Sequence, residues 1–216
     1  MQSKIKPKTF FISTFYKCFA LKNLERLEIS FREELKKRKI IGTVVLTPEG
    51  INSTIAASNK LSLNHGIRFI EKFTGNLVIK NSLSNKQPFK KLKIKKRDEI
   101  VPSGFNLNLN NHEGKYIEPK DWQEFISQKN VVTIDVRNDY EIEVGTFKNS
   151  LSPKTKNFRE FNKFIKENKE KLSKKKLAIF CTGGIRCEKA SVLFENNGLK
   201  DVHQLNGGIL NFFEKE

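Results

Sequence analysis

The sequence predicts two consecutive domains that mix helices and strands: an α+β domain over residues 1–101 and a doubly wound α/β domain with a parallel sheet over 115–216. Three observations predict this arrangement. The first half alternates β-branched and aromatic segments with amphipathic helical segments. The second half contains short, continuous apolar segments, as buried parallel strands do. Between them, residues 102–114 are rich in Asn, Gly and Ser, which predicts a linker.

The first domain is expected to follow the order strand, helix, strand, strand, helix, strand. Strands are indicated where β-branched and aromatic residues cluster, and helices where apolar residues recur every three or four positions. The expected strands are 9–15, 42–46, 53–57, 77–80 and 89–97, and the expected helices are 24–39 and 61–73. This order is the split βαβ, or ferredoxin-like, arrangement, which places both helices on one face of an antiparallel sheet.

The second domain is expected to alternate helices with buried strands. Its first helix, 119–128, carries Pro119 at a position that helix starts favour, and Gly198 suits the end of a later helix. The expected strands are 131–136, 177–181 and 202–205, and the expected helices are 140–144, 158–172, 187–196 and one opened by Gly207 and Gly208. Strands that alternate with helices predict a parallel sheet.

Composition excludes two classes of protein. The chain of 216 residues is 37% hydrophobic and contains 18 Phe, which is enough for packed cores and excludes a disordered chain. No apolar run approaches the roughly 18–20 residues of a membrane span. The basic N-terminus lacks the apolar core of a signal peptide, and three cysteines form no disulfide framework. We therefore expect a cytoplasmic protein that does not associate with a membrane. The sequence indicates no stable protein partner.

The positive charge is concentrated in the first half. Residues 1–100 contain 22 Lys and Arg against 8 Asp and Glu, whereas residues 101–216 contain 19 against 16, so +14 of the net +17 lies in the first half. Such asymmetry favours a polyanionic partner, and nucleic acid is the usual one. A general lysine-rich bias is the alternative, but it leaves the nearly balanced second half unexplained.

The last expected strand of the first domain carries the densest basic run. Leu92 and Ile94 alternate with lysines, so one face is apolar and the other cationic. Such an edge strand can bind phosphates, and it can equally serve to block edge-to-edge aggregation. The candidate nucleic-acid ligands are Lys90, Lys91, Lys93, Lys95, Lys96 and Arg97.

The most specific chemical signal is a cysteine that ends an apolar strand and is followed by a glycine loop. Ligands bind at the carboxyl ends of parallel strands, where Cys181 is expected. Loop amides, the next helix N-terminus and the charge of Arg186 favour the thiolate, which is the nucleophile. The loop residues are Thr182, Gly183, Gly184 and Ile185. A buried, inert cysteine is the structural alternative.

The spacing C-x4-R makes a ring one residue smaller than the C-x5-R ring of cysteine phosphatases, so it suits a persulfide sulfur or a similarly small group. Cys187 follows Arg186 and has two open interpretations. It can attack an adduct on Cys181 to form a disulfide, or it can be a small residue that permits close packing.

Further charged residues are candidates for the rim of the site, whereas the sequence contains no recognised metal-binding or nucleotide-binding motif. Asp135 and Arg137 are expected near the rim; the structural alternative is an ion pair between them or capping of the turn at 138–140. Arg137 and Arg159 are candidate anion ligands. No His and Cys pattern predicts a metal site. No Walker A or G-x-G-x-x-G motif predicts a nucleotide site, so no cofactor is identifiable.

Four segments together resemble the rhodanese-related tRNA uridine(34) hydroxylase family. They are IDVRNDYEIEVGTF at 134–147, NFREF at 157–161, CTGGIRCEKAS at 181–191 and QLNGGIL at 204–210. PEGIN at 48–52 and PFKKLK at 88–93 are similar to the N-terminal domain of that family. Members of that family usually continue beyond the final helix, whereas this sequence ends at Glu216.

The resemblance implies oxygen-dependent hydroxylation of the wobble uridine of tRNA to 5-hydroxyuridine. It implies a rhodanese-like second domain, Cys181 as the active-site cysteine and persulfide carrier, molecular oxygen as co-substrate, and tRNA as the partner of the basic first domain. Two other functions remain open at this point: a sulfurtransferase that carries a Cys181 persulfide, and a non-catalytic RNA-binding module. The intact loop argues against the latter, because a docking domain does not need it.

Overall fold

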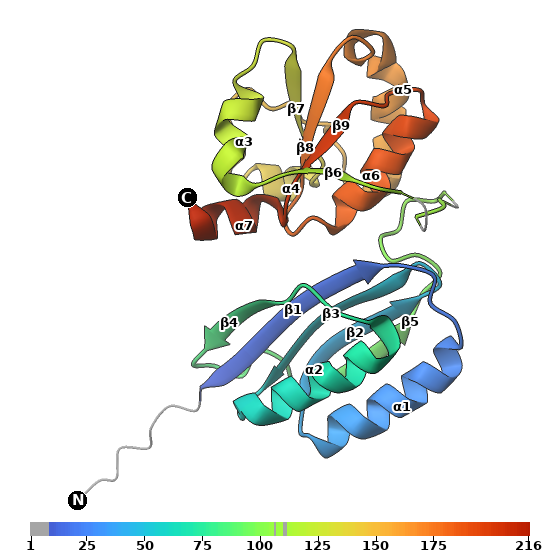
Figure 1. Cartoon of the computed structure of the whole chain (residues 1–216), viewed down its shortest axis with the longest axis vertical. Helices are drawn as coiled ribbons and strands as arrows, with labels where there is room; N and C mark the ends of the chain where they lie inside the picture. The colour runs from blue at the N-terminus through green and yellow to red at the C-terminus, as the bar shows by residue number, and fades with distance from the viewer. Residues whose placement is uncertain (1–8, 106, 110–111) are drawn as a thin grey trace, which may run out of the picture. The chain divides into compact units, whose positions relative to one another are not determined.

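The computed structural model describes residues 9–105, 107–109 and 112–216. The chain divides into two compact units, one that ends at Ile100 and one that begins at Val101. Figure 1 shows a sheet with helices in each of them. Among the described residues, no helix combines the length and the apolar character that crossing a membrane requires.

The first unit is a five-stranded sheet in the order β4-β1-β3-β2-β5. Strands β4, β1, β3 and β2 pair antiparallel, in the order of a ferredoxin-like sheet. The strands are β1 (Phe10–Cys18), β2 (Ile41–Thr47), β3 (Gly50–Ala57), β4 (Lys80–Ser84) and β5 (Leu92–Lys96), and the helices are α1 (Leu24–Lys37) and α2 (Lys60–Thr74).

The prediction of a purely antiparallel sheet is wrong at one edge. The chain leaves β4 at one edge of the sheet and returns as β5 at the other edge, where β5 pairs parallel with β2. The strand expected at 77–80 also lies further along the chain, at Lys80–Ser84. Local sequence patterns report strands but not their partners, so neither the crossing nor the parallel pairing was visible in the sequence.

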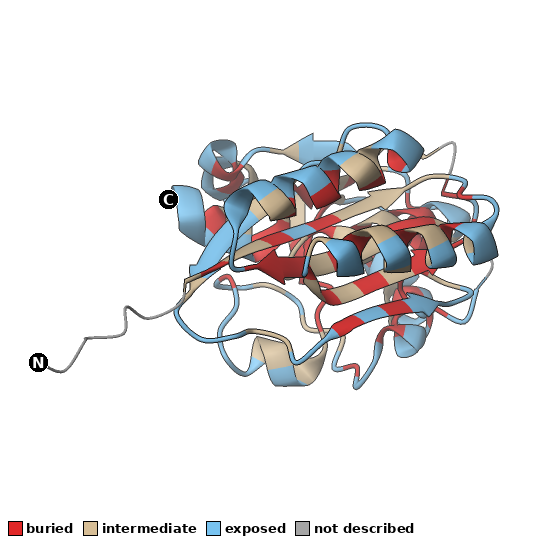
Figure 2. Ribbon diagram, turned by 90° about the horizontal axis from the view of Figure 1, so that it is seen from below, coloured by how far each residue is buried: buried red, intermediate tan, exposed pale blue. Residues whose placement is uncertain are grey.

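Helices α1 and α2 build the core of the first unit against the sheet. Phe31 of α1 is fully buried and forms edge-to-face contacts with Phe69 and Phe73 of α2, with ring centroids 5.9 and 5.6 Å apart. Figure 2 shows buried and exposed residues alternating along the helices, as amphipathic helices on a sheet require. The Leu and Phe residues spaced three and four apart in the sequence therefore face the sheet, as predicted.

The second unit is a four-stranded parallel sheet in the order β6-β9-β8-β7, as the alternation of elements predicts. The three-residue strand β6 and the short 3-10 helix η1 were not expected from the sequence. The elements are β6 (Lys115–Ile117), α3 (Pro119–Ile126), β7 (Val131–Asp135), α4 (Asp139–Ile142), η1 (Phe158–Glu160), α5 (Phe161–Leu172), β8 (Lys176–Phe180), α6 (Ile185–Asn196), β9 (Val202–Leu205) and α7 (Gly208–Lys215).

An aromatic cluster fixes the end of the central strand β8. Phe180, its last residue, packs edge-to-face on Phe147 at 4.8 Å and on Trp122 at 6.2 Å between ring centroids, and Phe212 of α7 packs on Phe147 at 4.9 Å. Phe180 and Trp122 are fully buried. The next residue is Cys181, so the backbone that carries this cysteine begins from a rigid position.

The segment expected as a linker is better fixed than its composition indicates. Ser103, Leu107 and Leu109 are buried, and the ammonium group of the fully buried Lys189 donates a hydrogen bond of 2.9 Å to the carbonyl oxygen of Val101. Residues 106, 110 and 111 of the expected linker lie outside the described residues. The Leu residues that alternate with Asn here are apolar anchors that a reading by composition overlooks.

Candidate active site

The candidate reactive cysteine lies in a loop between β8 and α6, as the sequence predicts. Its Sγ accepts a hydrogen bond of 3.1 Å from the backbone N–H of Gly184. Gly184 has φ +103°, a conformation that side chains other than glycine rarely adopt, so this glycine allows the chain to turn back over the sulfur. Helix α6 begins at the next residue, Ile185, and its first N–H groups also face Cys181.

The surroundings of Cys181 stabilise the thiolate. Burial on its own raises the pKa of Cys181, but three contributions outweigh it: a hydrogen bond with the Cys187 thiol, the positive charge of Arg186, and the backbone N–H groups of Arg186 and Cys187. Together they lower the pKa from 9.0 to about 6. Most of this thiol is therefore ionised near neutral pH, which is what a nucleophilic cysteine requires.

Cys187 is the opposite of Cys181 in its protonation. Burial, the hydrogen bond with Cys181 and the negative charges of Cys181 and Glu188 raise the pKa of Cys187 well above 9.0. Cys187 therefore stays protonated and can donate a hydrogen bond to the Cys181 thiolate. Both cysteines are free and fully buried. The structure thus brings together the two thiols that the sequence singled out.

Glu141 is a residue of the site that the sequence analysis missed. Its carboxylate oxygens accept hydrogen bonds of 2.6 and 2.7 Å from the guanidinium of Arg186, and a further one from the hydroxyl of Thr182. Arg186 also donates to the Thr182 hydroxyl at 2.9 Å. The triangle of Glu141, Arg186 and Thr182 fixes both ends of the cysteine loop.

The protonation of this triangle is stable near neutral pH. Burial raises the pKa of Glu141, but hydrogen bonds from Arg186 and Thr182 and the charge of Arg186 lower it to about 2. Glu141 also occupies the fourth position of a capping box that begins at Asn138. That local pattern was readable in the sequence, but its contact with Arg186, 45 residues away, was not.

Asp135 and Arg137 form the ion pair that the sequence analysis offered as the structural alternative. Arg137 donates to the two carboxylate oxygens of Asp135 at 2.9 and 2.6 Å, and both residues are buried. The hydroxyl of Thr146 donates a hydrogen bond of 2.7 Å to Asp135, and Arg137 donates one of 2.6 Å to the carbonyl oxygen of Gly145. This pair holds the turn after β7. Arg159 lies exposed on η1, and in the described residues no interaction joins its side chain to the cysteine loop.

The start of α7 supports the loop from the other side. The backbone N–H groups of Ile209 and Leu210 donate to the carbonyl oxygens of Cys181 and Thr182, at 2.8 and 3.2 Å. Gly208 has φ +71°, and a Cβ atom there would lie 2.5 Å from the carbonyl oxygen of Cys181. Only glycine allows α7 to approach the loop so closely. The sequence analysis assigned Gly208 to a helix start and not to the site.

The basic run at the edge of the first sheet divides between two faces. Leu92 and Ile94 are buried, whereas Lys91, Lys93 and Lys95 are exposed, as the alternation predicts. Lys96 points to the helix side and forms ion pairs with Glu25 at 3.0 Å and Glu28 at 3.8 Å, so glutamates of α1 compensate its charge. Lys90 and Arg97 flank β5 and are exposed.

The low pKa of Cys181 gives a test of this geometry. We expect the alkylation rate of Cys181 by iodoacetamide to reach half its maximum near pH 6, while Cys187 reacts only well above pH 9. Trypsin cuts after Lys176, Arg186 and Lys189, so mass spectrometry follows the two cysteines in separate peptides.

Arg186→Met is expected to shift the midpoint of the Cys181 alkylation profile to higher pH, because it removes the positive charge beside the thiolate. Fragmentation of the joined tryptic peptide then separates the two cysteines. Arg68→Met, an exposed site in α2, is the control and should leave the profile unchanged. Profiles for Cys181 and Cys187 that coincide in the unaltered chain would contradict the arrangement described above.

Two matches to known families cover the two units. Residues 10–100 match the UPF0176 acylphosphatase like domain, and residues 118–215 match the rhodanese-like domain. A rhodanese-related protein of Thermoplasma volcanium is 26% identical, covers 47% of this chain and 92% of its own, and has a TM-score of 0.36. The two family matches identify the site as the cysteine loop of a rhodanese-type domain that follows an acylphosphatase-like domain.

Relatives of known name match both units together. A protein of Picosynechococcus sp. named tRNA uridine(34) hydroxylase is 43% identical over 211 residues, which are 96% of this chain and 70% of the relative. A protein of Rickettsia conorii with the same name is 43% identical over 182 residues, which are 83% of this chain and 73% of the relative. The chain belongs to the tRNA uridine(34) hydroxylase family.

Proposed function

We propose that this protein hydroxylates uridine 34 of tRNA to 5-hydroxyuridine and that the reaction takes place at the Cys181 loop. The observation that carries the proposal is the Cys181 thiolate, held by backbone N–H groups and Arg186, in a chain whose relatives are named for this activity. A docking domain does not need an activated thiolate, so the loop supports an enzyme over a passive RNA-binding module.

The chemistry assigns distinct tasks to the residues of the loop. The Cys181 thiolate acts as the nucleophile, and the small C-x4-R ring suits a small group on its sulfur, such as a persulfide. Cys187, which stays protonated, donates a hydrogen bond to that sulfur. Glu141 and Thr182 hold Arg186 so that its charge remains beside the thiolate throughout the reaction.

The co-substrate that we propose is molecular oxygen. Exchange of the hydrogen at C5 of uridine for a hydroxyl with molecular oxygen uses an electron pair and two protons and releases water. An external reductant supplies that electron pair. In the part of the chain that the structure describes, no group of three or more His, Cys, Asp or Glu is placed to hold a metal ion.

The first unit is the part that we propose binds tRNA, and the cytoplasm, where tRNA is available, is the proposed compartment. Its excess of 14 positive charges favours a polyanion. The exposed lysines Lys91, Lys93 and Lys95 form a cationic row at the sheet edge, with Lys90 and Arg97 at its ends. The pairing of Lys96 with Glu25 and Glu28 removes it from this row.

The experiment that tests the function uses cells that lack U34 hydroxylation. Expression of this chain should restore 5-hydroxyuridine and its derivatives in bulk tRNA, measured by nucleoside mass spectrometry. A purified chain that turns over thiosulfate and cyanide rapidly, while the cells remain without 5-hydroxyuridine, would contradict the proposal. That result would establish a sulfurtransferase with a Cys181 persulfide instead.

A further inference from the structure

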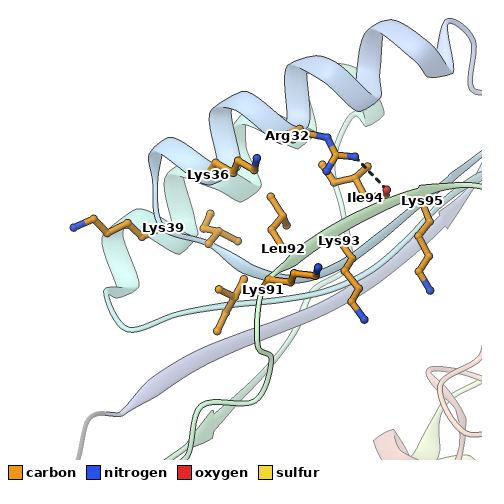
Figure 3. A pocket seen from close by; sticks show the side chains of 10 residues that line it. Arg32, Lys36, Lys39, Lys91, Leu92, Lys93, Ile94 and Lys95 are labelled. Atoms are coloured by element: carbon orange, nitrogen blue, oxygen red, sulfur yellow. Dashed lines mark hydrogen bonds between the residues drawn. The ribbon is translucent and has the colours of Figure 1, made fainter.

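A groove of about 720 Å³ lies in the first unit, between helix α1 and the edge strand β5. Figure 3 shows its walls from close by, with Arg32 and Lys36 extending from α1 and the strand below them. Six of the residues that line it are basic and none is acidic: Arg32, Lys36, Lys39, Lys91, Lys93 and Lys95. The first three were not recognised in the sequence, because they come from α1 and the turn after it, far before the basic strand in the chain.

The groove has two cationic rows. Arg32, Lys36 and Lys39 are spaced four and three residues apart, so they follow one face of α1 and the turn after it. Lys91, Lys93 and Lys95 alternate along the strand, and Figure 3 shows Lys93 and Lys95 pointing away from α1, on the other side of the edge. A ligand that lies along this edge therefore meets positive charge from both sides.

Among the described residues, the five lysines of the groove have no acidic partner, whereas Arg32 of the groove and two basic residues beside it do. Arg32, Arg38 and Lys96 all form ion pairs with glutamates of α1. By contrast, no ion pair links any of the five lysines of the groove to an acidic side chain within residues 9–105, 107–109 and 112–216. Uncompensated charges of one sign repel each other, and an anion that binds between them relieves that repulsion and releases counterions.

The floor of the groove is apolar, and its edge offers backbone donors. Leu92 and Ile94 point from the strand toward α1, and Ile40 and Ile41 complete the floor. β5 pairs only with β2, so in the described sheet the backbone groups on its outer side face away from any partner strand. Apolar surface beside phosphate ligands suits a chain of nucleotides, whose sugars and bases lie next to its phosphates.

The length of the two rows decides between one phosphate and several. Lys91 to Lys95 spans about 13 Å at roughly 3.3 Å per strand residue. Arg32 to Lys36 spans about 6 Å at roughly 1.5 Å per helical residue, and Lys39 lies in the turn beyond the end of α1. One strand of double-stranded DNA carries a phosphate about every 3.4 Å along its axis, so at a similar spacing the strand row accommodates about four phosphates. A single phosphate ion would leave most of these cations unused.

We propose that the groove between α1 and β5 binds the phosphate backbone of RNA, so that α1 as well as the edge strand holds the substrate. This inference rests on the proposed function for the identity of the RNA, a tRNA, but the groove itself is independent of the chemistry at Cys181. Lys36 and Lys39 contact phosphates from the helix side, and Lys91, Lys93 and Lys95 contact them from the strand side.

The test compares two sets of variants of the full chain in binding to tRNA at increasing salt concentrations. The first combines Lys36→Gln with Lys39→Asn, since asparagine tolerates the left-handed backbone of Lys39, which has φ +55°. The control is Lys72→Gln, because Lys72 lies exposed in the last turn of α2 as Lys36 does in the last turn of α1.

We expect the double variant to weaken tRNA binding by on the order of ten-fold, and to lower the slope of log K against log salt by about 0.7–0.9 for each lysine removed. The control should lose neither. An unchanged slope in the double variant would overturn the inference. So would a double variant that keeps its affinity for tRNA but no longer binds vesicles of phosphatidylserine, since the groove would then serve an acidic membrane.

Nucleoside analysis in cells separates the two proposals. If the unaltered chain restores 5-hydroxyuridine while the double variant binds tRNA as well as the unaltered chain, the function stands and the groove inference is wrong. If the double variant loses tRNA affinity although the unaltered chain restores no 5-hydroxyuridine, the groove inference stands and the hydroxylase proposal is wrong.

Discussion

Cys181→Ala is expected to reduce 5-hydroxyuridine formation by at least about 1,000-fold, because it removes the nucleophile on which the chemistry depends. The second unit should remain folded. Alanine fits the space of the buried cysteine, and the main cost is the N–H of Gly184 left without its sulfur acceptor, about 1–2 kcal/mol of unfolding free energy. Nucleoside mass spectrometry of tRNA measures the first effect, and thermal unfolding measures the second.

Cys18→Ala is the matched control for this variant. Cys18 ends β1 in the first unit and lies outside the cysteine loop, so its loss should leave 5-hydroxyuridine formation unchanged. If Cys181→Ala formed 5-hydroxyuridine at the normal rate, the loop would have no part in the reaction. The low pKa of its thiol would then serve another activity.

Gly208→Ala is expected to disrupt the same loop without touching the cysteine itself. The new Cβ would lie 2.5 Å from the carbonyl oxygen of Cys181 and 2.7 Å from that of Thr182, and the residue would keep a left-handed backbone at φ +71°. Both effects together should cost about 2 kcal/mol or more of unfolding free energy. Displacement of the loop by even about 1 Å should reduce hydroxylation roughly 100-fold.

Gly183→Ala separates this effect from a general sensitivity of the loop to alanine. Gly183 has no left-handed backbone, and a Cβ there would meet nothing within 4 Å. The unfolding temperature of the Gly183→Ala variant and the pH dependence of its Cys181 alkylation should therefore match those of the unaltered chain. If Gly208→Ala retained full activity and stability, the inference that α7 supports the loop would be wrong.

The elements of the second unit were predictable because each has a local signature. Continuous apolar segments predicted β7 and β8, and the alternation of strands with helices predicted β9. The cysteine followed by glycines and an arginine predicted the strand, loop and helix around Cys181. The ionisation of that cysteine was also predictable, since a helix N-terminus and an arginine at fixed spacing follow directly from the sequence.

The features that sequence patterns missed all depend on contacts between distant segments. Glu141 meets Arg186 across 45 residues, and Gly208 meets the Cys181 backbone only because β8 and β9 are neighbours in the sheet. The groove likewise needs α1 beside β5, a placement that follows from the parallel pairing of β5 with β2. None of these pairs carries a periodicity or a motif, so only the folded chain reveals them.

The most direct test of the account follows the oxygen atom that enters uridine. Cells that lack U34 hydroxylation would express the unaltered chain or Cys181→Ala under isotopically heavy molecular oxygen, and their tRNA nucleosides would be analysed by mass spectrometry. We predict that 5-hydroxyuridine appears only with Cys181 intact and that it carries the heavy isotope. 5-Hydroxyuridine that forms without Cys181, or that takes its oxygen from unlabelled water, would contradict the account.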